Sequence, residues 1–179
     1  MSAAVVVVDM LNRYEHEDAE PLRASVEQVL PNVQRIVEAA VERDLTVIYV
    51  NDNHGDWTAG RLELTEWARD GADASLVDPI APGPDIPLLL KARHSGFYDT
   101  QLEYLLKQRE ADAVIVIGQV TEQCILYTAL DAYVREFDVI LPRDAVAHID
   151  PEMADAAVRM MERNMHTRVL STEELLREL

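Results

Sequence analysis

Short runs of β-branched residues alternate along the chain with longer segments in which apolar residues recur every three or four positions. The run VVVV precedes Asp9 and the run VIVI precedes Gly118, and both are apolar on the two sides of an extended chain. Strands of this kind are typical of parallel sheets that helices cover on both faces. We therefore predict strands at residues 4–8, 45–50, 113–117, 138–141 and 167–170.

The segments between these runs are long enough to be crossover helices. In the first of them, Val26, Val29 and Val33 belong to one apolar stripe at helical spacing. We predict helices at residues 25–43, 100–109, 123–135 and 151–164, and a terminal helix at 172–179 with Thr172 at its start. The alternation of strands and helices predicts a three-layer α-β-α fold. Its sheet is doubly wound, Rossmann-like and mainly parallel, with about six strands in one domain over residues 1–179.

The segment 51–87 departs from this alternation, because it contains four glycines, four prolines and both tryptophans. It is too long for a plain connection, so we interpret it as a functional loop system or as a short helix near 61–69 between loops. The apolar residues 88–90 after it suggest another strand, which leads into Lys91.

Composition narrows the possible partners. The chain has 179 residues, with 16 Lys and Arg against 33 Asp and Glu, and a formal net charge of −17. Nucleic acid and anionic membrane surfaces are therefore poor partners. A single Cys cannot form an intramolecular disulfide, and the apolar run at 3–8 is too short for a signal peptide or a membrane span, so a cytoplasmic protein is expected.

Candidate chemistry follows the strands, since ligands of open α/β sheets collect at the carboxyl ends of the strands. Asp9, Lys91 and Cys124 all lie just past a predicted strand or at the start of the next helix. A thiol in the first turn of a helix, near a lysine, is expected to have a lowered pKa and to react as the thiolate. The alternative interpretations are a capping aspartate, a surface lysine and an inert buried cysteine.

Three separated motifs carry a family resemblance: VVVDMLNRY, KARHSGFYDT and GQVTEQC. Together they resemble the isochorismatase-like cysteine hydrolases, a superfamily that includes nicotinamidases, N-carbamoylsarcosine amidohydrolase, ureidoacrylate amidohydrolase and isochorismatase. The resemblance implies a catalytic triad of Asp9, Lys91 and Cys124. It also implies a cis peptide between Gln119 and Val120, with the backbone N–H groups of Val120 and Cys124 as an oxyanion hole.

The implied activity is hydrolysis of a C–N amide or carbamoyl bond of a small molecule through a thioester on Cys124, with Asp9 as the base. One alternative is vinyl ether hydrolysis of the isochorismatase type. Another is a catalytically silent member of the family that binds a small molecule or a protein. A haloacid-dehalogenase-like phosphatase is excluded because Leu11 stands where a second aspartate is needed, and a dinucleotide site is excluded because residues 9–14 contain no glycine.

For the substrate pocket, the resemblance and the positions of the aromatic residues favour Tyr14, Trp57 and Phe97 as lining residues. Asp52 and His54 match part of the nicotinamidase metal site, but two ligands do not complete a zinc site, so we expect no metal and no cofactor. The expected partners are a small-molecule substrate and further copies of this chain in a homo-oligomer.

Overall fold

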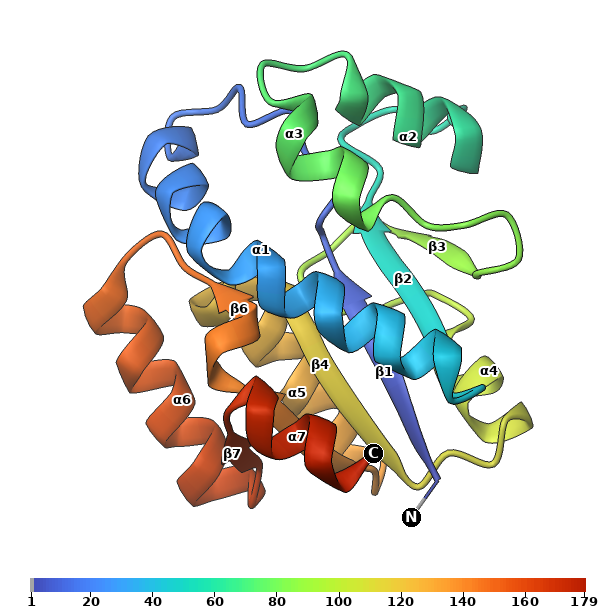
Figure 1. Ribbon diagram of the computed structural model, residues 1–179, viewed down its shortest axis with the longest axis vertical. Coiled ribbons are helices and arrows are strands. Elements are labelled where there is room, and N and C mark those ends of the chain that lie inside the picture. The colour runs from blue at the N-terminus through green and yellow to red at the C-terminus, as the bar shows by residue number, and fades with distance from the viewer. Residues whose placement is uncertain (1) are drawn as a thin grey trace.

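The computed structural model describes residues 2–179, which form a central sheet between two layers of helices (Figure 1). The strands are β1 (Ala3–Val8), β2 (Thr46–Asp52), β3 (Leu88–Lys91), β4 (Ala113–Gln119), β5 (Asp138–Pro142), β6 (Val146–Ala147) and β7 (Arg168–Leu170). The helices are α1 (Ala19–Glu42), α2 (Arg61–Arg69), α3 (Ala74–Val77), α4 (Leu102–Gln108), α5 (Leu126–Val134), α6 (Pro151–Met165) and α7 (Thr172–Glu178). Short helical turns are η1 (Asp78–Ile80), η2 (Thr121–Ile125) and η3 (Arg143–Ala145). The predicted three-layer α/β fold is confirmed.

All strand pairings are parallel, and the sheet runs β3-β2-β1-β4-β5-β7, with β6 paired to β4. The chain starts in the middle at β1, proceeds to β2 and β3, and then crosses back to build the other half from β4. The strand order thus reverses between β1 and β4, and loops diverge from such a point to leave room for a ligand. Strand β6, which was not predicted, has two residues and is too short to show a periodicity in the sequence.

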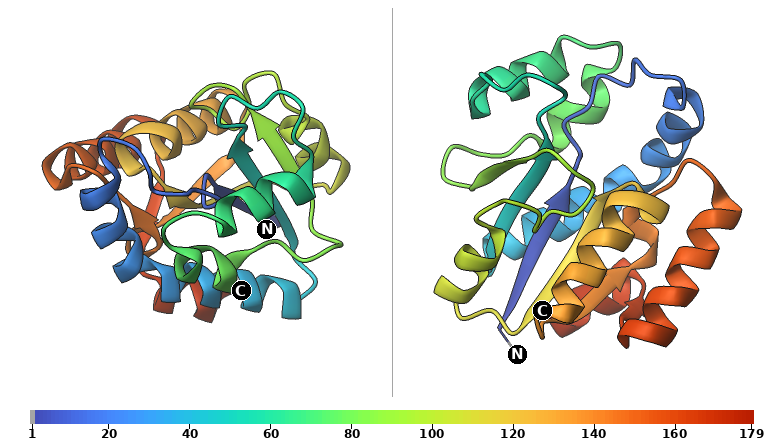
Figure 2. Two further views of the ribbon diagram at one scale, coloured as in Figure 1. Left: turned by 90° about the horizontal axis from the view of Figure 1, so that it is seen from above. Right: turned by 180° about the vertical axis from the view of Figure 1, so that it is seen from behind.

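The alternation of side chains along each strand explains why helices cover both faces. Val5 and Val7 of β1 join a core cluster with α1 and α7. Val6 and Val8 point the other way, into a cluster with α4, α5 and α6. Figure 2 shows α5 and α6 over the rear face, whereas α1 and α7 lie over the front face in Figure 1. A strand that is apolar on both faces is therefore buried on both.

Helix α1 starts earlier than predicted, and helix α7 is capped by a residue other than Thr172. Helix α1 begins at Ala19, six residues before the predicted start, with Pro21 in its first turn, where the missing N–H costs no helical hydrogen bond. Helix α7 is capped by Ser171, which forms a capping box with Glu174. The hydroxyl of Thr172 instead donates to Asp144 Oδ1 at 2.7 Å, so Thr172 anchors the helix to η3 and is not its cap.

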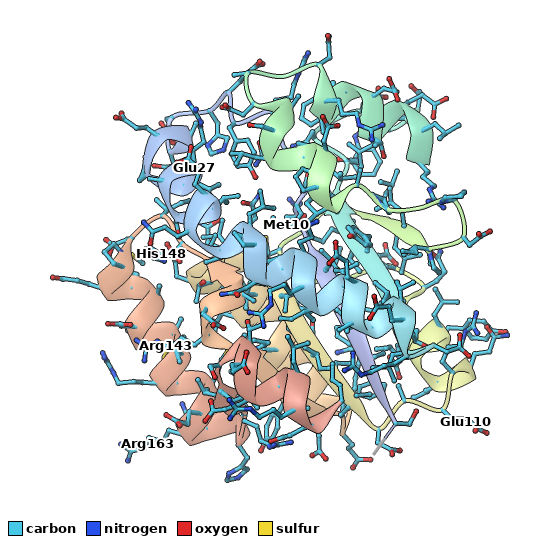
Figure 3. All side chains as sticks on the ribbon, viewed as in Figure 1. Met10, Glu27, Glu110, Arg143, His148 and Arg163 are labelled. Atoms are coloured by element: carbon cyan, nitrogen blue, oxygen red, sulfur yellow. The ribbon has the colours of Figure 1, made fainter. Side chains whose placement is uncertain are left out.

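The surface of the molecule is rich in charged side chains. Glu110 and Arg163 are exposed at the periphery, whereas Met10 is buried beneath α1 (Figure 3). Within residues 2–179, no helix has the length and apolar content needed to cross a membrane.

Candidate active site

The carboxyl ends of β1, β2 and β3 lie side by side and bring polar residues to one edge of the sheet. Asp9 follows β1 directly, and Lys91 is the last residue of β3, paired in register with Asp52 of β2. Cys124 lies in η2, which follows β4 on the other side of β1. The edge is the one predicted to collect the functional residues.

Lys91 connects the other two residues of the predicted triad. Its ammonium Nζ lies 2.8 Å from Asp9 Oδ2 and donates to Cys124 Sγ at 3.6 Å. The third N–H of the ammonium donates to the backbone carbonyl of Arg93 at 3.0 Å. Asp9, Lys91 and Cys124 are all buried, so the structure brings these three side chains together in a poorly solvated cluster.

Asp9 is fixed by its backbone and by both carboxylate oxygens. The residue has a left-handed backbone (φ 53°), and its carbonyl oxygen accepts from Gln119 Nε2 at 2.5 Å. Oδ1 accepts from the backbone N–H of Asp52 at 2.7 Å, while Oδ2 faces Lys91. The carboxylate is therefore held in one orientation toward Lys91.

Cys124 lies in a π-helical turn that precedes α5, where the sequence predicted a helix beginning at residue 123. The turn is held from outside by Glu122, whose Oε1 accepts from the backbone N–H groups of Ile149 and Asp150 at 2.9 and 2.8 Å. The peptide bond between Gln119 and Val120, just before the turn, is cis.

The electrostatics of the cluster correct one expectation. The pKa of the Cys124 thiol is raised to about 12. Burial is the largest cause, and the negative charge of Asp9 raises this pKa more than the positive charge of Lys91 lowers it. The prediction of a lowered pKa for this thiol is wrong, because desolvation and Asp9 together outweigh the effect of Lys91. Burial alone would lower the pKa of Lys91, but Asp9 and Cys124 reverse this and the pKa stands above its usual value. The cluster therefore rests with a neutral thiol and a charged lysine.

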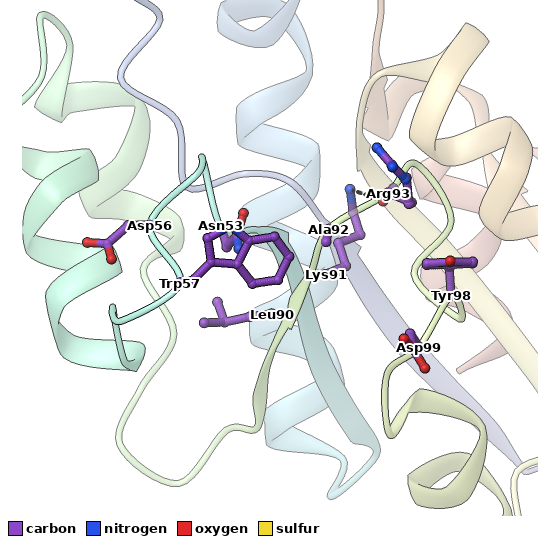
Figure 4. A pocket seen from close by; sticks show the side chains of 9 residues that line it. All are labelled: Asn53, Asp56, Trp57, Leu90, Lys91, Ala92, Arg93, Tyr98 and Asp99. Carbon is purple, nitrogen blue, oxygen red and sulfur yellow. Dashed lines mark hydrogen bonds between the residues drawn. The ribbon is translucent and has the colours of Figure 1, made fainter.

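A cavity of about 500 Å³ opens beside Lys91 (Figure 4). It is lined by Asn53, Asp56, Trp57, Leu90, Lys91, Ala92, Arg93, Tyr98 and Asp99. Of the three aromatic residues predicted to line a pocket, Trp57 lies in this wall. Phe97 instead packs in the core, with its ring centroid 6.1 Å from that of Phe137, and its neighbour Tyr98 faces the cavity. Tyr14 is buried, with its hydroxyl 3.4 Å from Gln119 Oε1.

The residues that match part of a metal site have other partners. Asp52 Oδ1 accepts from the backbone N–H of His54, and His54 Nε2 lies 2.9 Å from the carbonyl oxygen of Leu11. The ring of His54 also stacks on Trp67 at 4.4 Å. In the part of the chain that the structure describes, no three His, Cys, Asp or Glu side chains come together in a metal-binding group.

One contact of the Cys124 sulfur was not predicted from the sequence. His94 Nδ1 lies 3.7 Å from Cys124 Sγ, and the imidazole stacks on Tyr127 of α5 with 5.4 Å between ring centroids. The available signal was the position of His94 inside KARHSGFYDT, three residues after Lys91. That spacing alone does not reveal which way the loop turns after β3.

The chain is similar to known proteins over nearly its whole length. A family model described as the isochorismatase domain matches residues 3–174. The uncharacterized isochorismatase family protein YaaI of Bacillus subtilis is 30% identical over 173 residues, which are 97% of this chain and 96% of that protein.

Solved structures are similar over almost the whole chain. An isochorismatase-like hydrolase from Alkaliphilus metalliredigens matches with a TM-score of 0.81 and 25% identity, covering 99% of both chains. N-carbamoylsarcosine amidase from Thermoplasma acidophilum matches with a TM-score of 0.75 and 28% identity, covering 97% of this chain and 98% of that one.

Proposed function

The chain belongs to the isochorismatase domain family, and on that premise we propose that it is a cysteine hydrolase that cleaves a C–N amide or carbamoyl bond of a small molecule. The observation that carries the proposal is the contact chain from Asp9 Oδ2 through Lys91 Nζ to Cys124 Sγ, with distances of 2.8 and 3.6 Å, beside an open cavity. The similarity to an amidase supports the choice of bond.

In the first half of the proposed reaction, Cys124 Sγ attacks the carbonyl carbon as its thiol proton moves to a base, for which Asp9 is the candidate. The backbone N–H groups of Val120 and Cys124 are the proposed donors to the oxyanion. The C–N bond then breaks, the leaving nitrogen takes the proton, and an acyl thioester remains on Cys124.

In the second half, water attacks the thioester while Asp9 takes one of its protons. The C–S bond breaks, the proton returns to sulfur, and the product is a carboxylate. Lys91 supports both steps, because its fixed positive charge lies against the sulfur that carries the developing negative charge. A thiol that rests neutral also avoids the cost of a buried thiolate between turnovers.

The test is ammonia release from a panel of small primary amides, ureas and N-carbamoyl amino acids. We expect turnover of at least one class by the wild-type chain, and a loss of about 10³-fold or more in Cys124→Ala, as for the removal of other catalytic nucleophiles. Cys124→Ser is the matched variant, because it keeps the size of the side chain and removes the thiol.

Isochorismate serves as the competing probe in the same assay. Turnover of isochorismate that survives in Cys124→Ala, without turnover of any amide, would replace the proposal by vinyl ether hydrolysis. Binding of panel compounds without turnover by a folded wild-type chain would replace it by a binding role.

A further inference from the structure

Three polar side chains face the sulfur of Cys124, those of Asp9, Lys91 and His94, and they differ in what they can do with a proton. Lys91 Nζ lies at 3.6 Å, and a charged ammonium only donates hydrogen bonds. His94 Nδ1 lies at 3.7 Å, and an imidazole nitrogen accepts a hydrogen bond when the proton resides on Nε2. In that tautomer His94 offers the thiol hydrogen an acceptor, in addition to the carboxylate of Asp9.

The imidazole is held in place by the segment that also carries the nucleophile. Its ring is nearly parallel to the ring of Tyr127, at an interplanar angle of 19° and a centroid distance of 5.4 Å. Tyr127 is the second residue of α5, which directly continues the turn that contains Cys124. The imidazole of His94 therefore stacks on the same continuous helical segment that carries the sulfur of Cys124.

The two sides of the sulfur differ in exposure. Lys91 and Asp9 are buried, and both carboxylate oxygens of Asp9 already accept, one from Asp52 and one from Lys91. His94 is exposed. His94 is therefore the one of these three groups that touches both the sulfur and solvent.

We propose that His94 is a further catalytic residue, which accepts the thiol proton of Cys124 in the first half of the reaction in place of Asp9, while Asp9 remains the base that takes a proton from water in the second half. As the Sγ–C bond forms, the proton moves from Sγ to Nδ1. As the C–N bond breaks, Nδ1 returns it to the leaving nitrogen, and His94 is neutral again at the thioester stage. The inference rests on the proposed function and adds a residue outside the predicted triad.

The test is the rate at which iodoacetamide alkylates Cys124, which needs no substrate. His94→Phe keeps a ring to stack on Tyr127 and removes the nitrogen, while His16→Phe changes another exposed histidine of a loop and serves as the control. We expect His94→Phe to slow alkylation at pH 7 about tenfold or more, since a positioned base contributes about 10²–10⁴-fold. His16→Phe should match the wild type.

Two further readings separate proton transfer from packing. The groups that face the thiol are Asp9, Lys91 and His94, and only the last is changed in His94→Phe. The alkylation rate of this variant should rise about tenfold per pH unit between pH 7 and 9, as expected when only the thiolate reacts, and the wild-type rate should rise less. Added imidazole should restore part of the lost rate in His94→Phe.

The inference is overturned by a wild-type alkylation rate in His94→Phe. It is equally overturned by a slower rate with an unchanged pH slope and no rescue by imidazole, because that pattern means packing alone. If no amide is hydrolysed but alkylation depends on His94 as described, the proposed function fails and the thiol–imidazole proton transfer stands. If amides are hydrolysed at wild-type rates by His94→Phe, only the inference fails.

Discussion

Each N–H donor of Lys91 has a partner, which explains how an ammonium is tolerated where its side chain is 1% exposed. The partners are Asp9 Oδ2, the carbonyl oxygen of Arg93 and Cys124 Sγ. A buried charge without such partners costs several kcal/mol. The same three contacts place one positive charge between the carboxylate of Asp9 and the sulfur of Cys124.

The neutral thiol of Cys124 predicts a loss of stability at alkaline pH. An unfolded thiol titrates near pH 8.5, whereas the folded thiol has a pKa of about 12. Between these values the unfolded state binds fewer protons than the folded state, so the free energy of unfolding falls as pH rises, by about 1.4 kcal/mol per pH unit from this group. Urea denaturation at pH 8 to 11, with a reductant present, measures the effect.

Cys124→Ala provides the comparison, because it removes the thiol and leaves other alkaline groups in place. Burial raises the pKa of Tyr14 and of Tyr49, so the wild type and Cys124→Ala both lose some stability at high pH. The wild type should nevertheless lose stability more steeply than Cys124→Ala between pH 9 and 11. Parallel curves would show that the thiol is not held neutral in the folded state.

Among the elements, the close approach of β4 to β1 fixes where the turn that contains Cys124 begins. Gly118 pairs with Val8 and has a φ of 113°, and a Cβ at this position would overlap the carbonyl oxygen of Val8. Only glycine permits this pairing. The next residue, Gln119, then reaches the carbonyl oxygen of Asp9, so the register of two strands fixes the site.

Gly118→Ala should destabilise the fold by about 2–5 kcal/mol, because it adds backbone strain to a steric overlap. Gly55→Ala is the matched control: it also has a positive φ, at 82°, but no atom lies within 4 Å of the added Cβ. Its cost should be limited to the strain, about 1–3 kcal/mol. Equal losses for the two variants in urea denaturation would contradict the close approach of β4 to β1.

The sequence predicted the elements whose side chains repeat regularly, and missed features set by contacts between elements. The runs of Val and Ile in β1 and β4 predict strands that are buried on both faces. The reversal of strand order follows from the fold class. The choice between Phe97 and Tyr98 as a cavity residue depends on one turn after β3, and neighbours in a chain point in different directions. The π-helical turn around Cys124 likewise leaves no periodic signal.

The whole molecule carries a formal net charge of −17, while the cluster of Asp9, Lys91 and Cys124 lies at the point where the strand order reverses. The positions of all three residues were predictable, because strand ends converge there. The protonation of the thiol was not, since it depends on burial and on distances that only the folded chain defines. The expected homo-oligomer stays a prediction.

The central claim is that Cys124 becomes acylated during turnover, and intact-protein mass spectrometry tests it most directly. An amide from the panel that releases ammonia is mixed with the enzyme, and the reaction is quenched in acid within the first turnovers. The account predicts a population of the 20.2 kDa chain that is heavier by the acyl group, sensitive to hydroxylamine and absent in Cys124→Ala. Ammonia release that proceeds at the wild-type rate in Cys124→Ala, with no acylated chain in either protein, would contradict it.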